Sequence, residues 1–107
     1  MARREEFNRD QWKDQLAVFS KKNFGRNITL ESEHSIIIIN TPFVSITYDS
    51  IFGDSLKINM GLEKDEITRT IFNPFDIRVT NDNKGRNVSM QIIDTDNETI
   101  YIYFNDI

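Results

Sequence analysis

Residues 11–25, QWKDQLAVFSKKNFG, decide the fold because they carry the helical pattern of the chain. Trp12, Leu16 and Phe19 recur at i, i+4 and i+7, which places them on one face of an amphipathic helix. Lysine and aspartate side chains fall mostly on the other face. The apolar face is either a binding surface or the cover of a hydrophobic core.

Flanking residues set the limits of this helix. Asn8 or Asp10 can cap the helix. With Asn8 as N-cap, Gln11 three positions later fits a capping box, and Gly25 fits the position that follows a helix. The pattern predicts a helix over residues 9–23, with residues 1–8 flexible before it.

After Gly25 the apolar period changes from 3.6 to two, which is typical of strands. Short alternating segments and turns continue to Phe104, and no second helical segment separates them. Without crossover helices the strands are expected to pair antiparallel. The sequence predicts one α+β domain over 1–107: an N-terminal helix packed on a strongly bent, mostly antiparallel sheet, or partly closed small barrel, of six to eight strands over 27–104.

The helix is expected to cover the open side of this sheet, because the strands present more apolar faces than they can bury alone. The run Ile36–Ile39 lacks alternation, which predicts burial on both faces or packing beneath the helix. Phe104 ends a strand in which apolar residues alternate with tyrosines, so that strand is expected inside the sheet. The predicted core contains Trp12, Leu16, Phe19, Leu56, Ile58, Ile100 and Ile102.

The composition excludes several classes of site. With no cysteine, the chain of 107 residues has no disulfide, thiolate metal site or cysteine nucleophile. The N-terminal stretch lacks the apolar segment of a secretory signal, and the longest wholly apolar run, Ile36–Ile39, is too short to cross a membrane. We expect a cytoplasmic location.

Charge is divided unevenly along the chain. Residues 1–26 carry a net charge of +3 and residues 27–107 a net charge of −7, giving −4 in total. An acidic protein lacks the basic footprint of a nucleic-acid binder, so direct nucleic-acid binding is disfavoured. The division reflects either a solvated surface or a face that meets a basic partner.

No pattern in the sequence points to catalysis or to a cofactor. His34 is the single histidine and lies between two predicted strands without a partner residue for acid–base chemistry. Asp94, Asp96 and Glu98 alternate as oxygen ligands could, but they lack the glycine and distal glutamate of a calcium loop and fit a hairpin turn. We therefore expect no catalytic residue, no metal and no cofactor.

Four residues are candidates for contact with a partner. Tyr101 and Tyr103 share one face of the last strand, where they fit a protein contact better than base stacking in an acidic protein. Arg69 and Arg78 each lie among apolar neighbours in a strand. They either point outward, form a buried ion pair or contact a ligand.

Two segments also resemble a known family. Residues 9–31 contain Trp12, a Phe-Ser pair at 19–20, two lysines and Gly25 before an apolar strand, and residues 66–79 and 88–104 contain a Thr-rich strand, a proline, an Arg-Val strand and a closing hairpin. This pattern is similar to the bacterial family catalogued as domain of unknown function 5335. The chain has Asn97 where the family usually has glycine, and Asn23-Phe24 where it often has a histidine. The resemblance implies the fold and a single domain but no activity.

These observations favour a small non-enzymatic domain that binds a protein partner or itself. The alternative is an acidic inhibitor of a host nucleic-acid enzyme, encoded by a phage or mobile element, of the anti-CRISPR or anti-restriction type. Acidic side chains gathered on one face would favour this alternative, and an even spread would weaken it.

Overall fold

The fold was analysed in a computed structural model, which describes residues 3–33, 35–51, 53–61 and 66–106. A short 3-10 helix, Arg9–Gln11, leads into the helix α1, Trp12–Asn23. The strands are β1 Arg3–Glu6, β2 Asn27–Ser32, β3 Ser35–Asp49, β4 Ser55–Met60, β5 Ile67–Phe72, β6 Pro74–Asn81, β7 Asn87–Asp94 and β8 Thr99–Phe104. The predicted α+β class is confirmed.

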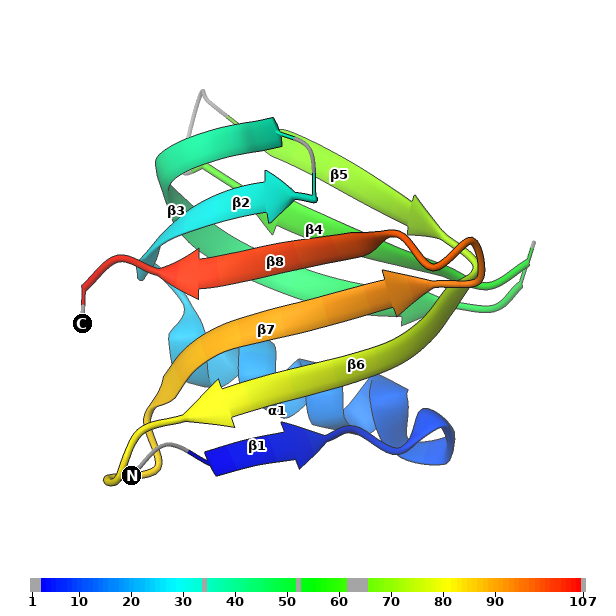
Figure 1. The fold of residues 1–107 in the computed structure, drawn as a ribbon, viewed down its shortest axis with the longest axis horizontal. Coiled ribbons are helices and arrows are strands. Elements are labelled where there is room, and N and C mark those ends of the chain that lie inside the picture. The colour runs from blue at the N-terminus through cyan, green and yellow to red at the C-terminus, as the bar shows by residue number, and fades with distance from the viewer. Residues whose placement is uncertain (1–2, 34, 52, 62–65, 107) are drawn as a thin grey trace.

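The eight strands form one antiparallel sheet in the order β1-β6-β7-β8-β2-β3-β4-β5. The sheet curls strongly but does not close, so β1 and β5 are its two free ends (Figure 1). β8 pairs with β7 and β2, which confirms its predicted interior place.

A bend in β3 produces the curl. Residues Ser35–Pro42 of this 15-residue strand pair with β2, whereas Phe43–Asp49 pair with β4. Asn40 near the change has φ of 53°, and the pairing register shifts after Phe43. A positive φ and a register shift both turn a strand sharply. β3 therefore belongs to both walls of the curled sheet.

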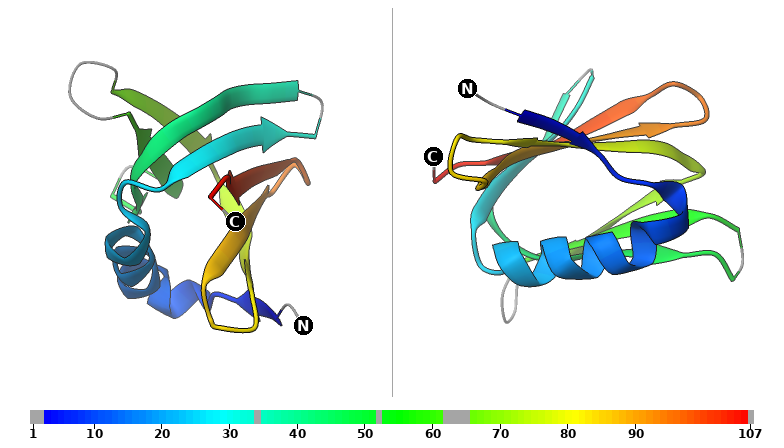
Figure 2. Two further views of the ribbon diagram at one scale, coloured as in Figure 1. Left: turned by 90° about the vertical axis from the view of Figure 1, so that its left-hand side faces the viewer. Right: turned by 90° about the horizontal axis from the view of Figure 1, so that it is seen from below.

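α1 lies beside the second half of β3, where β2 no longer pairs with it (Figure 2). Ser20 Oγ accepts a hydrogen bond from Ile46 N at 2.9 Å and donates one to Ile46 O at 3.1 Å. One hydroxyl thus satisfies both backbone groups that a neighbouring strand would have paired. The helix extends the wall of the curled sheet past β3.

The apolar face of α1 covers the core, as predicted. Trp12, Leu16 and Phe19 are 1%, 0% and 3% exposed, and Phe19 meets Phe43 and Phe104 at centroid distances of 5.7 and 5.9 Å. The four predicted core residues of the sheet are also buried: Leu56, Ile58, Ile100 and Ile102.

Three expectations about local structure are wrong. Residues 3–6 form β1 on β6, so the sheet extends beyond 27–104 and into the segment that we expected to be flexible. Asn8 precedes the 3-10 helix without a side-chain capping bond, because the first turn is not α-helical. Ile36 and Ile39 are exposed, since this half of β3 lies beyond the reach of the helix.

Candidate functional site

A groove follows the line along which the curled sheet fails to close. Its walls are α1 on one side and β1 with the β6–β7 hairpin on the other, and its volume is about 650 Å³. We call it the seam groove; its lining includes Glu5, Phe7, Gln15, Val18, Lys22 and Asn87. This size lies within the range of roughly 300–1,000 Å³ that is usual for ligand sites.

The floor of the seam groove is apolar and its rim is polar. Phe7 and Phe19 meet edge to face at 6.4 Å below it, and both are buried in the core. Val18, on the helix wall, is 67% exposed. An apolar floor with a polar rim is the usual anatomy of a protein-binding surface.

Gln15 gives the groove an unmet acceptor. Its Oε1 is buried and has no hydrogen-bond partner among the described residues. A buried polar atom left without a partner costs roughly 1–3 kcal/mol.

The groove continues into a second hollow of about 690 Å³ along β1. The two hollows share Glu5, Asn81 and Gly85, and the second adds Arg3 and Arg4 to its lining. β1 is an end strand, so one edge of its backbone is open within the described sheet. Open backbone groups along a groove are a template for an added strand.

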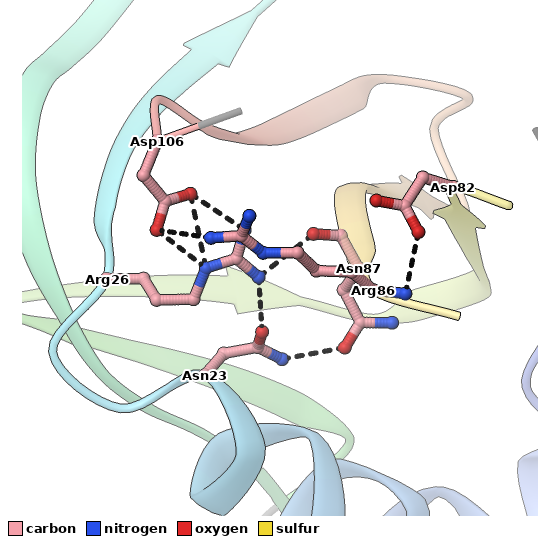
Figure 3. Close-up of polar contacts among 6 residues, drawn as sticks. All are labelled: Asn23, Arg26, Asp82, Arg86, Asn87 and Asp106. Carbon is pink, nitrogen blue, oxygen red and sulfur yellow. Dashed lines mark hydrogen bonds and ion pairs between the residues drawn. The ribbon is translucent and has the colours of Figure 1, made fainter. Parts of the chain in front are cut away.

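A polar cluster closes the end of the seam groove (Figure 3). Arg26 donates to Asp106 Oδ1 at 2.7 Å, to Asn23 Oδ1 at 2.7 Å and to the Asn87 carbonyl at 2.9 Å. Its guanidinium also lies 4.0 Å from the centroid of the Phe104 ring. These contacts fix a guanidinium whose side chain is only 13% exposed.

Asp106 lies between two guanidinium groups. Arg86 Nη2 contacts Asp106 Oδ2 at 3.1 Å, opposite Arg26. The hydrogen bonds from Arg26, followed by the charges of Arg26 and Arg86, hold the pKa of Asp106 below its ordinary value. The carboxylate is thus stabilised in its charged form.

Two buried asparagines join the helix to the sheet in this cluster. Asn23 Nδ2 donates to Phe19 O and to Asn87 Oδ1, both at 2.8 Å. Lys22 Nζ, one residue earlier, donates to the carbonyl of Gly85 at 2.9 Å. These bonds set the spacing between the two walls at one end of the seam groove.

The tight turns are built by aspartates. Asp82 Oδ1 accepts from the amides of Lys84 and Arg86, which lowers the pKa of Asp82, and Gly85 has the positive φ that this turn needs. Asp94 Oδ1 accepts from the amides of Asp96 and Glu98 in the same way. The predicted hairpin turn at 94–98 is confirmed.

The structure brings three of the four predicted contact residues to one face. Tyr101 and Tyr103 stack at 5.7 Å with 13° between their rings on the outer face of β8. Gln91 lies between Tyr101 and Arg78 across the strands. Burial, followed by the charge of Glu31 and then by Tyr101, raises the pKa of Tyr103.

The arginines differ from each other. Arg78 contacts Asp76 at 3.0 Å and Glu6 at 3.4 Å, so its charge is already paired within the sheet, at a half-buried position. Arg69 is exposed on the end strand β5 and makes no ion pair with another described residue. The buried ion pair considered for Arg69 is wrong, because its side chain is exposed although Ile71 on the same strand is buried.

The remaining expectations concern His34, metal ligands and membrane-spanning segments. His34 lies outside the described residues. Over the described ranges, no group of three or more potential metal ligands comes together, and no helix has the length and apolar character to cross a membrane.

Comparison with known proteins gives no relative: no family model, no curated protein and no solved structure matches the chain. The resemblance to the family catalogued as domain of unknown function 5335 stays a prediction.

Sequence patterns missed Asn23, Arg26 and Asn87. Each belongs to a polar stretch that resembles ordinary helix-end or turn sequence, and the contacts among them join residues at least 61 positions apart in two of three cases. Gln15 is a polar helix residue that no local pattern distinguishes from a solvated one. The unclosed sheet, which no local pattern encodes, makes it part of a groove.

Proposed function

We propose that this protein is a non-enzymatic interaction domain that binds an extended segment of a partner protein in the seam groove. The observation that carries the proposal is the groove between α1 and the open edge of β1. A segment laid there would pair with the backbone of β1 and place alternate side chains over Phe7 and Phe19.

The lining of the two hollows carries charges of both signs. The basic residues are Arg3, Arg4 and Lys22, and the acidic residues are Glu5, Asp14 and Asp82. A partner segment with charges of both signs therefore fits the groove best. Opposite charges across an interface speed association and set the orientation of the partner.

The inhibitor alternative receives less support. The described carboxylates are spread over β1, α1, β2, β3, β6, β7 and several turns, and several are paired with arginines. This spread is the pattern that weakens mimicry of a nucleic acid. Absence of catalysis and a cytoplasmic location stay predictions.

A peptide-display selection with a matched pair of variants tests the proposal. Val18→Glu places a charge in the groove, whereas Ala17→Glu places the same charge at an exposed helix position that does not line it. Selected extended peptides should bind wild type and Ala17→Glu alike, and Val18→Glu at least about tenfold more weakly, since one charge in an apolar contact costs over 1.4 kcal/mol.

Amide chemical shifts locate the bound peptide. Perturbations should fall on residues 3–7, on α1 and on the β6–β7 hairpin. Equal loss of binding in both variants, or perturbations confined to the Tyr101–Tyr103 face, would refute the seam groove as the site.

A further inference from the structure

The end strand β5 is longer than the other end strand, β1, and carries fewer charges. β5 runs over six residues, Ile67–Phe72, pairs with β4 without a register shift, and carries Arg69 as its only charged side chain. β1 has four residues, all charged. Natural sheets protect edges with charge, short length or bulges. β5 has none of these except Arg69.

The exposed side chains of β5 are apolar as well as polar. Ile67 is 44% exposed and Phe72 is 70% exposed, although both lie in a regular strand. We infer that β5 pairs antiparallel with β5 of a second copy of this chain, so that two sheets join into one across a two-fold axis. This inference does not depend on the seam groove, which borders the opposite end of the sheet.

The sequence of β5 selects one register for this pairing. In an antiparallel pair, residues directly opposite share a face. Centring the axis on Arg69 would oppose two arginines, which is unfavourable. Centring it on Thr70 opposes two threonines and sets Thr68 against Phe72 of the second copy. Cross-strand Thr–Thr and aromatic–β-branched pairs are both stabilising.

The same register accommodates the inner face of the strand. Arg69 lies opposite Ile71 of the second copy, where its aliphatic stem covers an apolar neighbour. Asn73, with φ of 53°, and Pro74 end the strand directly after Phe72, so the pairing stops where the overlap is complete. The second copy is favoured over an unrelated strand because β5 is self-complementary.

Sedimentation and cysteine cross-linking test the dimer and its register. The wild-type protein should show twice the 12.6-kDa chain mass, with dissociation on dilution. The cysteine-free sequence permits single substitutions. Thr70→Cys places two sulfur-bearing residues directly opposite, at a Cα separation of about 4.5–5.5 Å that suits a disulfide.

Two substitutions serve as controls for the cross-link. Thr68→Cys keeps the two cysteines four residues out of register, about 14 Å apart along the strands. Lys57→Cys exposes a thiol beside Thr70 on β4, inside the sheet. Under mild oxidation Thr70→Cys should form a cross-linked dimer at least about tenfold faster than either control.

A charge exchange tests the interface without oxidation. Thr70→Lys and Thr70→Asp should each be monomeric alone, and their mixture should form a heterodimer because opposite charges then face each other. A wild-type monomer at every concentration up to about 100 μM, or equal cross-linking at all three cysteine positions, would overturn the inference. Cross-linking at Arg69→Cys in place of Thr70→Cys would overturn the register.

Discussion

Trp12 is the residue whose removal should damage the fold most. It is 1% exposed, its ring meets Tyr48 edge to face at 5.4 Å, and its Nε1 donates to Phe7 O at 3.2 Å. Trp12→Ala should lower the free energy of unfolding by about 3–5 kcal/mol, because it leaves a cavity and removes that hydrogen bond. Urea unfolding followed by circular dichroism measures this, since the substitution removes the only tryptophan.

The matched control for Trp12 is Val18→Ala on the same helix. Val18 is exposed, so its truncation should change stability by less than about 0.5 kcal/mol. Near-native stability of Trp12→Ala would mean that the aromatic face of α1 is not the cover of the core.

Arg26 should be the most costly polar residue to replace. Arg26→Gln leaves Asn23 Oδ1 and the Asn87 carbonyl without this donor and leaves Asp106 with Arg86 alone. Buried acceptors left unmet cost roughly 1–3 kcal/mol. Arg86→Gln is the matched control, because the Arg86 side chain is half exposed and its ion pair within the described residues is with Asp106. We expect a smaller loss there, measured as the midpoint of urea unfolding.

Asp106 should make the free energy of unfolding depend on pH in acidic solution. Its pKa is lowered in the folded protein, so its contribution is complete above the ordinary aspartate pKa of about 3.9 and is lost as the pH falls through the folded value. Asp106→Asn should therefore be less stable than wild type at pH 7, with a difference that shrinks below about pH 4. An unchanged difference between pH 7 and pH 2 would contradict this assignment.

At the scale of the elements, Ser20 attaches the helix to the sheet. Ser20→Ala removes the partner of both Ile46 backbone groups and should cost about 1–3 kcal/mol, with faster hydrogen exchange at the Ile46 amide. Ser50→Ala, at an exposed position after β3, is the control and should leave that amide unchanged. Unchanged exchange at Ile46 in Ser20→Ala would mean that the helix is held by apolar packing alone.

The helix, with its strong apolar period, was predictable from the sequence. The edge strand β1 and the bend of β3 were not. The i, i+4, i+7 spacing of Trp12, Leu16 and Phe19 predicted both the helix and its buried face, because the side chains of one helix face share one environment. β1 was missed because four charged residues have no apolar alternation and pair only through their backbone. The bend at Asn40 was missed because β3 exchanges β2 for β4 as its partner there, and no local pattern encodes such an exchange.

The candidate site was less predictable than the fold because it depends on the whole molecule. The sequence placed Tyr101 and Tyr103 on one strand face, which is a local property. The seam groove exists because β1 and β3 are separated by a helix that fills only part of the gap, and this follows from the global curl of the sheet. Side chains that line it, such as Gln15, are indistinguishable in sequence from solvated ones.

The seam between α1 and β1 predicts which amides of the molecule exchange their hydrogens first. Within the described ranges, the bonds that cross the seam involve side chains, including those from Trp12 to Phe7 and from Lys22 to Gly85, whereas β7 and β8 share a backbone ladder. Amides of β1 and of the turn at 82–86 should therefore exchange faster than those of β7 and β8. Hydrogen exchange followed by mass spectrometry measures this order.

Lys22→Ala should increase exchange on both sides of the seam. It removes the exposed bond to the Gly85 carbonyl, and losing a net ~0.5–1 kcal/mol raises the population of the open form about two- to fivefold. Lys21→Ala, an exposed neighbour with no side-chain hydrogen bond to another described residue, is the matched control. Equal exchange in the two variants would show that Lys22 does not hold the seam, and would leave the Asn23–Asn87 contact as the bond that sets the width of the groove.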